Sequence, residues 1–190
     1  MKTALAALVL FAFGSGEASA AQWQVDPAKS SLSFVLTWAK EPFKAEFKKW
    51  AADIDFDPAD LAHAKVDVAI DIGSLLSEDP VNDKYRNGPN GLDVAHFRQA
   101  RFVTKSFRAA GPGKYEATAD LAVHGITKEV KLPFALTIAG NTAHMTGDLT
   151  VSRIDFGVGT GSVFGIDWAS ERTVLHAVKI AVDLTATKKP

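Results

Sequence analysis

The chain has 190 residues, and its 21 basic and 22 acidic side chains leave a formal charge of −1. This balance gives no reason to expect a nucleic acid or an anionic membrane surface as a partner. The chain has no cysteine, which excludes disulfides, a thiol nucleophile and covalent haem attachment.

The N-terminus begins with Met1-Lys2, continues with the apolar run TALAALVLFAF and reaches Ala18-Ser19-Ala20. A positive start, a short apolar middle and small residues before a cleavage point are typical of a secretory signal peptide. The apolar run is too short to span a bilayer, which takes about 20 residues. We therefore predict a signal peptide over residues 1–20, export to the periplasm of a bacterial source, and one domain over residues 21–190.

Alternation of apolar and polar residues dominates the rest of the chain. In chain order it predicts strands in SSLSFVLT (30–37), near 44–56, and in KVDVAIDI (65–72), ARFVTKSFRA (100–109), KYEATADLAV (114–123), EVKLPFALTI (129–138), TAHMTGDLTVS (142–152) and TVLHAVKIAVDL (173–184). Successive strand side chains point to opposite faces, so each segment has one apolar side. The segment over 100–109 is the weakest, because Phe102, Val103 and Phe107 divide between the two faces.

One stretch, SEDPVNDKYRNGPNGLDVAHF (77–97), does not alternate. Its Asp-Pro start and Asn-Gly stops predict a short helix near Pro80–Arg86 and a turn near Leu92–Phe97, in an insert that caps a barrel mouth or covers one side. About eight antiparallel strands predict a closed barrel or a sandwich. We favour the barrel, because closure removes exposed strand edges. The predicted fold is all-β: an eight-stranded antiparallel barrel with a short helical insert.

Between Tyr115 and Ile138, His-Gly-Ile-Thr-Lys separates two alternating runs. Gly125 can take the positive φ that a hairpin corner often needs, so the interruption predicts a turn. A metal site at His124 would need partners, and the other histidines lie singly, with no ligand-like spacing. We therefore expect a structural role for His124.

The same hairpin resembles the signature of the YceI-like family, Tyr-x-x-x-Gly-x-Leu-Thr-hydrophobic-x-Gly-x-Thr-Lys-x-Val. WQVDPAKSSLSFVL, IDFDPADLAHAKVDVAIDIGSL, DVAHFRQARFVTKSF and SRIDFGVG resemble further blocks of that family in the same order. The resemblance implies a lipocalin-like eight-stranded barrel that binds polyisoprenoid lipids, such as isoprenoid quinones or prenyl phosphates, in an elongated apolar lumen without catalysis. The chain departs from the family pattern at Trp38, Ala45, Ala119, Ala122 and the stretch 80–91, which leaves the identity of the ligand open.

The candidate ligand-binding residues are apolar side chains of inward-facing parity, together with two residues beside the glycine-rich loop at 157–165. They are Phe34, Leu36, Phe47, Ile54, Phe56, Val68, Ile70, Leu121, Phe134, Leu136, Met145, Leu149, Arg153, Phe156, Val178 and Ile180. Arg153, with Asp155 and Arg172, is a candidate for contact with a polar head group; the alternative is a surface ion pair or a structural Arg–Asp corner. A filled barrel that binds nothing would need the same apolar residues, and this alternative stays open.

Other functional classes have less support. In FGVGTGSVFG no helix pattern follows the glycines, as a phosphate-binding loop requires. Ser30 and Ser31 lie in no nucleophile motif, and Asp53, Asp55 and Asp57 alternate as on the wet face of a strand, so we expect neither an enzyme nor a metal site. A carrier of another amphiphilic lipid and an accessory module that binds partners in a periplasmic redox or membrane complex are the alternatives. A homodimer is left open.

Overall fold

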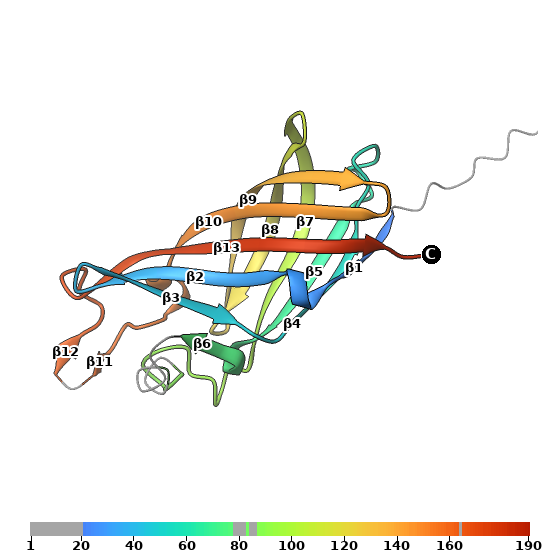
Figure 1. Cartoon of the computed structure of the whole chain (residues 1–190). Helices are drawn as coiled ribbons and strands as arrows, with labels where there is room; N and C mark the ends of the chain where they lie inside the picture. Colours follow the sequence, from blue (N-terminus) through green and yellow to red (C-terminus); the bar gives the residue numbers. More distant parts are fainter. Residues whose placement is uncertain (1–20, 78–82, 84–86, 164) are drawn as a thin grey trace, which may run out of the picture.

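The computed structural model describes residues 21–77, 83, 87–163 and 165–190. Its strands are β1 (Gln22–Val25), β2 (Ser31–Trp38), β3 (Glu41–Phe47), β4 (Trp50–Asp55), β5 (Lys65–Asp71), β6 (Leu75–Ser77), β7 (Gln99–Gly111), β8 (Lys114–Val123), β9 (Ile126–Ala139), β10 (Thr142–Ser152), β11 (Ser162–Val163), β12 (Ile166–Asp167) and β13 (Val174–Lys188) (Figure 1). Three 3₁₀ turns with bounds in the described residues are η1 (Pro27–Lys29), η2 (Ile72–Ser74) and η3 (Arg153–Phe156). The helix predicted near Pro80–Arg86 lies outside the described residues except for Asp83.

The sheet closes on itself. Strands β1, β4, β5, β7, β8, β9, β10 and β13 pair in this order, and β13 pairs back to β1. The pairs are antiparallel throughout, so the chain forms a closed eight-stranded barrel (Figure 1). The predicted all-β barrel is confirmed.

Bends in the N-terminal half of the chain produce additional strands that extend the sheet beside the closed barrel. Strand β1 continues through η1 into β2, and β5 continues through η2 into β6. Asp26 and Asp71 precede these turns, and each side chain accepts a hydrogen bond from the backbone two residues further on. The second halves form a wing in which β13 pairs β2, β2 pairs β3, and β3 pairs β6. Strand β13, with 15 residues, is long enough to pair with both β1 and β2.

The described part of the insert, which connects β6 to β7 in sequence, packs against one side of the barrel. Leu92 and Val94 pack against a cluster of Leu32, Ile70, Ile72 and Ala100. The predicted turn near Leu92–Phe97 is present, as hydrogen bonds from the N–H groups of His96 and Phe97 to the carbonyl of Asp93. The insert therefore covers one side of the barrel, as the sequence predicts.

The hairpin corner is also as predicted. Val123 pairs with Ile126, and the two residues between them, His124 and Gly125, have φ values of 53° and 74°. Two positive φ angles in a two-residue loop define a turn whose twist matches the strands. The His124 ring lies 4.4 Å from the centroid of the Phe97 ring, so it packs against the insert.

A bulge corrects the prediction for the segment over 100–109. Phe102 and Phe107 are five positions apart, which in a regular strand would place them on opposite faces. The register of β7 against β8 shifts between Thr104 and Ser106, and both phenylalanines point into the barrel. Val103 alone of the three points outward, with 37% of its surface exposed.

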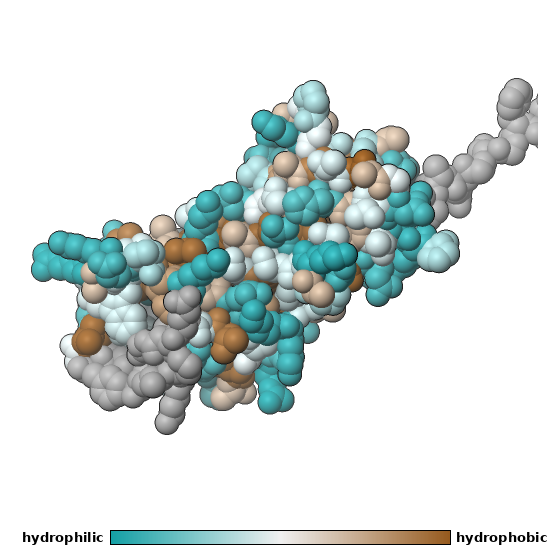
Figure 2. Space-filling model, in the orientation of Figure 1, coloured by the Kyte–Doolittle hydropathy of each residue, from teal (hydrophilic) through white to brown (hydrophobic). Residues whose placement is uncertain are grey.

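Aromatic rings fill the end of the barrel near the β7–β8 and β9–β10 hairpins. Phe56 lies 5.1 Å from Phe107, 5.5 Å from Tyr115 and 6.0 Å from Phe134 between ring centroids. On the face of the molecule shown in Figure 2, hydrophilic residues predominate and hydrophobic ones occur in small groups. The large apolar side chains are therefore mostly inside.

Candidate functional site: an apolar cavity in the barrel

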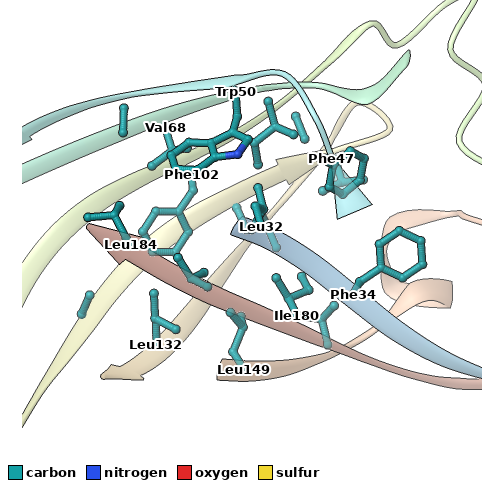
Figure 3. A pocket seen from close by; sticks show the side chains of 18 of the residues that line it. Leu32, Phe34, Phe47, Trp50, Val68, Phe102, Leu132, Leu149, Ile180 and Leu184 are labelled. Atoms are coloured by element: carbon teal, nitrogen blue, oxygen red, sulfur yellow. The ribbon is translucent and has the colours of Figure 1, made fainter. Parts of the chain in front are cut away.

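Beyond the aromatic end, the barrel is hollow. The cavity has a volume of about 290 Å³ and receives side chains from strands on all sides of the barrel (Figure 3). Besides tryptophans, the only wall residues with polar side chains among the described residues are Thr104 and Arg153. The hydroxyl of Thr104 accepts from the Val66 N–H at 2.8 Å and donates to the Val66 carbonyl at 3.2 Å, so it offers little to a ligand.

The structure brings all the predicted site residues together on this wall. They are Phe34, Leu36, Phe47, Ile54, Phe56, Val68, Ile70, Leu121, Phe134, Leu136, Met145, Leu149, Arg153, Phe156, Val178 and Ile180. The alternation in the sequence thus identified the inner face correctly. Their contact with a ligand stays a prediction.

The sequence analysis missed other wall residues for different reasons. Leu132 and Leu184 have the same parity as the chosen Phe134 and Ile180, so a stricter use of alternation would have found them. Phe102 and Phe107 depend on the bulge in β7. Trp168 comes from a loop without periodicity.

With a cavity of about 290 Å³, the barrel is neither completely filled by its own side chains nor an open tube. A cavity of about 150 Å³ in another protein holds benzene, which has six carbon atoms. By that measure the present cavity, at about 290 Å³, holds roughly a dozen carbon atoms. This suits a short apolar tail or the first part of a long one.

Arg153 lies at one end of the cavity, where its side chain clamps backbone carbonyls. Only 6% of its surface is exposed. Its Nε donates to Leu175 O at 3.0 Å, its Nη1 to Val158 O at 3.0 Å and Gly159 O at 2.7 Å, and its Nη2 to Trp168 O and to Val174 O at 2.9 Å. A guanidinium has five N–H groups, so every donor is used.

This geometry corrects the expectation for the charges around the glycine-rich loop. Arg153 has no donor left for a head group, and its partners are carbonyls instead of the carboxylate of an Arg–Asp corner. Burial lowers its pKa, while Glu171 and Asp167 act in the opposite direction. Asp155 and Arg172 are exposed, apart from the clamp. Arg153 is a structural residue that holds together segments 158–159, 168 and 174–175.

Two aromatic residues lie at the same end. The rings of Trp38, on β2, and Trp168 are 5.7 Å apart. The insert approaches the glycine-rich loop there, where the side-chain nitrogen of Asn90 donates to Ser162 O at 3.5 Å. Leu92, Val158 and Trp168 from these segments line the cavity. We refer to this end, marked by Trp38 and Trp168, as the mouth.

The described residues offer little for chemistry elsewhere. They contain no group of three or more His, Asp or Glu side chains placed to hold a metal ion. His63, His96 and His144 each contact a single aspartate. In the part of the chain that the structure describes, no helix has the length and apolar character needed to cross a bilayer.

The fold and the cavity define a lipocalin-like β-barrel with an apolar interior. The model of the YceI-like domain matches residues 23–186, and the chain belongs to that family. A UPF0312 protein of Vibrio campbellii is 31% identical over 142 residues, which cover 73% of this chain and 74% of the relative. A UPF0312 protein of Pseudomonas savastanoi is 28% identical over 169 residues, which cover 83% of this chain and 88% of the relative.

Solved structures agree with this assignment. Burkholderia cenocepacia BcnA superposes with a TM-score of 0.81 at 32% identity, covering 86% of this chain and 100% of that one. A domain from Saccharophagus degradans, described as polyisoprenoid binding and implicated in plant cell wall breakdown, gives a TM-score of 0.68 at 14% identity, covering 89% of this chain and 99% of that one. At that identity the likeness shows the fold alone. None of these proteins has the name of an enzyme.

Proposed function

We propose that the protein binds an isoprenoid lipid, such as an isoprenoid quinone or a prenyl phosphate, in the barrel cavity and carries or sequesters it without catalysis. The observation that carries the proposal is the apolar wall, whose two charged or hydroxyl-bearing side chains already use their polar atoms within the protein. Such a wall can bury an apolar tail, and its described residues offer no group that could attack or polarise a substrate. The polyisoprenoid-binding description of the Saccharophagus degradans domain supports the choice of ligand.

The size of the cavity sets the expected energetics. Burying a dozen carbons contributes about 10 kcal/mol at about 0.8 kcal/mol per CH₂. Association costs at least about 4 kcal/mol in lost freedom, which leaves about 6 kcal/mol or less. This corresponds to a dissociation constant of tens of micromolar or weaker. Tight binding would therefore need contacts outside the cavity.

The first test is extraction of protein purified from its native host with organic solvent, followed by mass spectrometry. An isoprenoid in amounts comparable to the protein is the expected result, with an unrelated exported protein purified in parallel as the control. The second test is titration of delipidated protein with prenols of increasing length. Affinity should rise steeply up to about a dozen carbons and then level off. Absence of both an extracted lipid and saturable prenol binding would refute the proposal.

We also propose that the protein acts after export, because the sequence of residues 1–20 is typical of a signal peptide. An aqueous compartment between membranes is where an insoluble lipid needs a carrier. N-terminal sequencing of protein from the periplasmic fraction should begin at Ala21. Recovery of the full chain from the cytoplasm would contradict this proposal.

A further inference from the structure

The barrel wall has a gap in its hydrogen-bond ladder. Pairing of β1 with β4 ends at Trp23–Ile54, and pairing of β2 with β3 begins at Ser33–Glu46. The two segments of the chain, β1–β2 and β3–β4, bend between these points, one at η1 and the other between β3 and β4 (Figure 1). No strand pairing joins them over this stretch. We refer to the unpaired strip, residues 24–30 facing residues 46–52, as the seam.

A groove of about 390 Å³ lies on the seam. Its lining includes Trp23, Phe47, Trp50 and Ala52, and these four residues also line the cavity. Only side chains therefore separate the groove outside from the lumen inside. Phe47 and Trp50 lie at the edge of the cavity in Figure 3 and are half-buried, which fits side chains placed between two compartments.

The groove differs from the cavity in its chemistry. Lys48 and Lys189 line it, with Glu46 as the only carboxylate among its lining residues. Lys48 Nζ lies 2.6 Å from Glu46 Oε2, whereas Lys189 Nζ lies 4.0 Å from Asp53, whose side chain is 88% exposed. Such a long, exposed contact binds an ammonium group only weakly.

Trp50 provides a further donor. Its indole N–H has no hydrogen-bond partner among the described residues, and it is not among their buried unsatisfied atoms. In contrast, the indole N–H of Trp23 donates to Phe56 O at 2.9 Å. Two ammonium groups and one unused N–H, set against one carboxylate, favour a ligand group rich in acceptor oxygens.

We propose that the seam holds the anionic head of the ligand, of the phosphate or carboxylate type, while its tail passes between Phe47 and Trp50 into the cavity. This inference rests on the proposed function, since it takes the tail to lie in the lumen. The other candidate position is the mouth, where Arg153, the one buried cation among the described residues, already uses its five N–H groups on carbonyls. The seam also supplies the contacts outside the cavity that tight binding requires.

Tryptophan fluorescence can locate the head, because Trp23 and Trp50 mark the seam and Trp38 and Trp168 mark the mouth. The probe is stearic acid with a nitroxide beside its carboxylate, since a nitroxide quenches only nearby fluorophores. The double variant Trp38→Phe/Trp168→Phe keeps only the seam tryptophans and should be quenched by a larger fraction than the unaltered protein, whereas Trp50→Phe should be quenched by a smaller fraction. A smaller quenched fraction in Trp38→Phe/Trp168→Phe, with no loss in Trp50→Phe, would place the head at the mouth and overturn the inference.

Immobilisation of the nitroxide, seen by electron paramagnetic resonance, reports binding separately from its location. A probe that never becomes immobilised, together with absence of saturable prenol binding, refutes the proposed function itself. A probe that is immobilised but does not quench Trp50 refutes only the seam. Trp50→Phe should bind the probe more weakly because it lacks the indole N–H, so its quenching is measured at a probe concentration at which the nitroxide is fully immobilised.

The lysines provide an independent test with a matched control. Lys48→Gln and Lys189→Gln should each weaken binding of a prenyl phosphate about two- to five-fold and leave the neutral prenol of equal length unchanged. Lys128→Gln makes the same charge change at an exposed position on β9 outside the groove and should affect neither ligand. Equal effects from all three variants, or none from the two groove variants, would overturn the head-group assignment. Competition by inorganic phosphate at the concentration of the prenyl phosphate would assign the groove to a free anion instead.

Discussion

Substituting larger apolar side chains into the cavity wall tests whether the barrel is hollow or filled. Leu32 on β2 and Leu149 on β10 are both buried and both line the lumen (Figure 3). The double variant Leu32→Phe/Leu149→Phe adds about six carbon atoms and no polar atom. Because a phenylalanine ring replaces a branched four-carbon side chain, each substitution adds only about 25 Å³, or roughly 50 Å³ in total. That is about a sixth of the 290 Å³ cavity.

The expected loss of affinity follows from the lost volume. At the benzene scale of about 25 Å³ per carbon, two fewer buried ligand carbons correspond to about 1.6 kcal/mol, or roughly ten-fold in the dissociation constant. We therefore expect a loss of about ten-fold for a prenol of about a dozen carbons. The free energy of unfolding of the delipidated protein should change by less than about 1 kcal/mol, since the rings enter empty space.

Equilibrium denaturation and prenol titration measure the two quantities on the same preparations. The control is Leu32→Met/Leu149→Met, which nearly conserves volume and should preserve both binding and stability. In a close-packed core the phenylalanine variant would instead lose about 1–3 kcal/mol per site. A destabilised variant, or one that binds the prenol normally, would refute the reasoning that the barrel is hollow.

Further predictions concern the clamp, the surface pairs and the hairpin corner. Arg153→Ala should lower the free energy of unfolding by at least about 3 kcal/mol, measured by urea denaturation, because it leaves buried carbonyl groups without a hydrogen-bond donor. A loss below about 1 kcal/mol would contradict the role of Arg153 as a clamp. Gly159→Ala should destabilise by about 2 kcal/mol, since Gly159 has a φ of 67° and an added Cβ would lie 2.6 Å from Arg153 Nη1; unchanged stability would mean that the loop can rearrange. The hydrogen bond from Arg108 lowers the pKa of Glu116 from its ordinary 4.5, so its contribution is present above pH 4.5 and disappears as the pH falls through the lowered value; Glu116→Gln should be slightly less stable than the unaltered protein at neutral pH and equally stable in strong acid, and a difference that grows on acidification would reverse the sign. His124→Asn should leave prenol affinity unchanged and stability within about 1 kcal/mol, because asparagine tolerates the positive φ; loss of binding with an intact fold would assign His124 a functional role.

Several features of the fold follow from local patterns that any reader of the sequence can check. Alternation identified seven of the eight strands of the closed barrel; it missed β1, and the predicted strand over 30–37 is β2, which lies outside the closed ring. The parity within the predicted strands selected wall residues such as Phe34 and Ile180 that the structure places on the cavity. Gly125 predicted a corner because glycine adopts the positive φ that a tight hairpin turn needs, and the structure shows that His124 also has a positive φ. These predictions hold because each depends on neighbours along one strand or turn.

Other features depend on parts of the chain that are distant in sequence. The inward position of both Phe102 and Phe107 requires a bulge that is defined only against β8. The role of Arg153 depends on carbonyls contributed by residues up to 22 positions away, so the neighbouring Asp155 suggested an ion pair that does not exist. The seam exists because two bent strands separate at different points, which neither strand shows alone.

The sequence by itself determined that this chain is built of antiparallel β-strands and which of their side chains face inward, since the direction of a side chain follows from its position in an alternating strand. Only the tertiary structure decided that the strands close into a barrel, that its interior is partly empty, that Arg153 binds backbone carbonyls at one end and that a groove adjoins the lumen at Trp50. A cavity is the small difference between the volume a barrel encloses and the volume its side chains fill, and that difference exists only once every strand is in place.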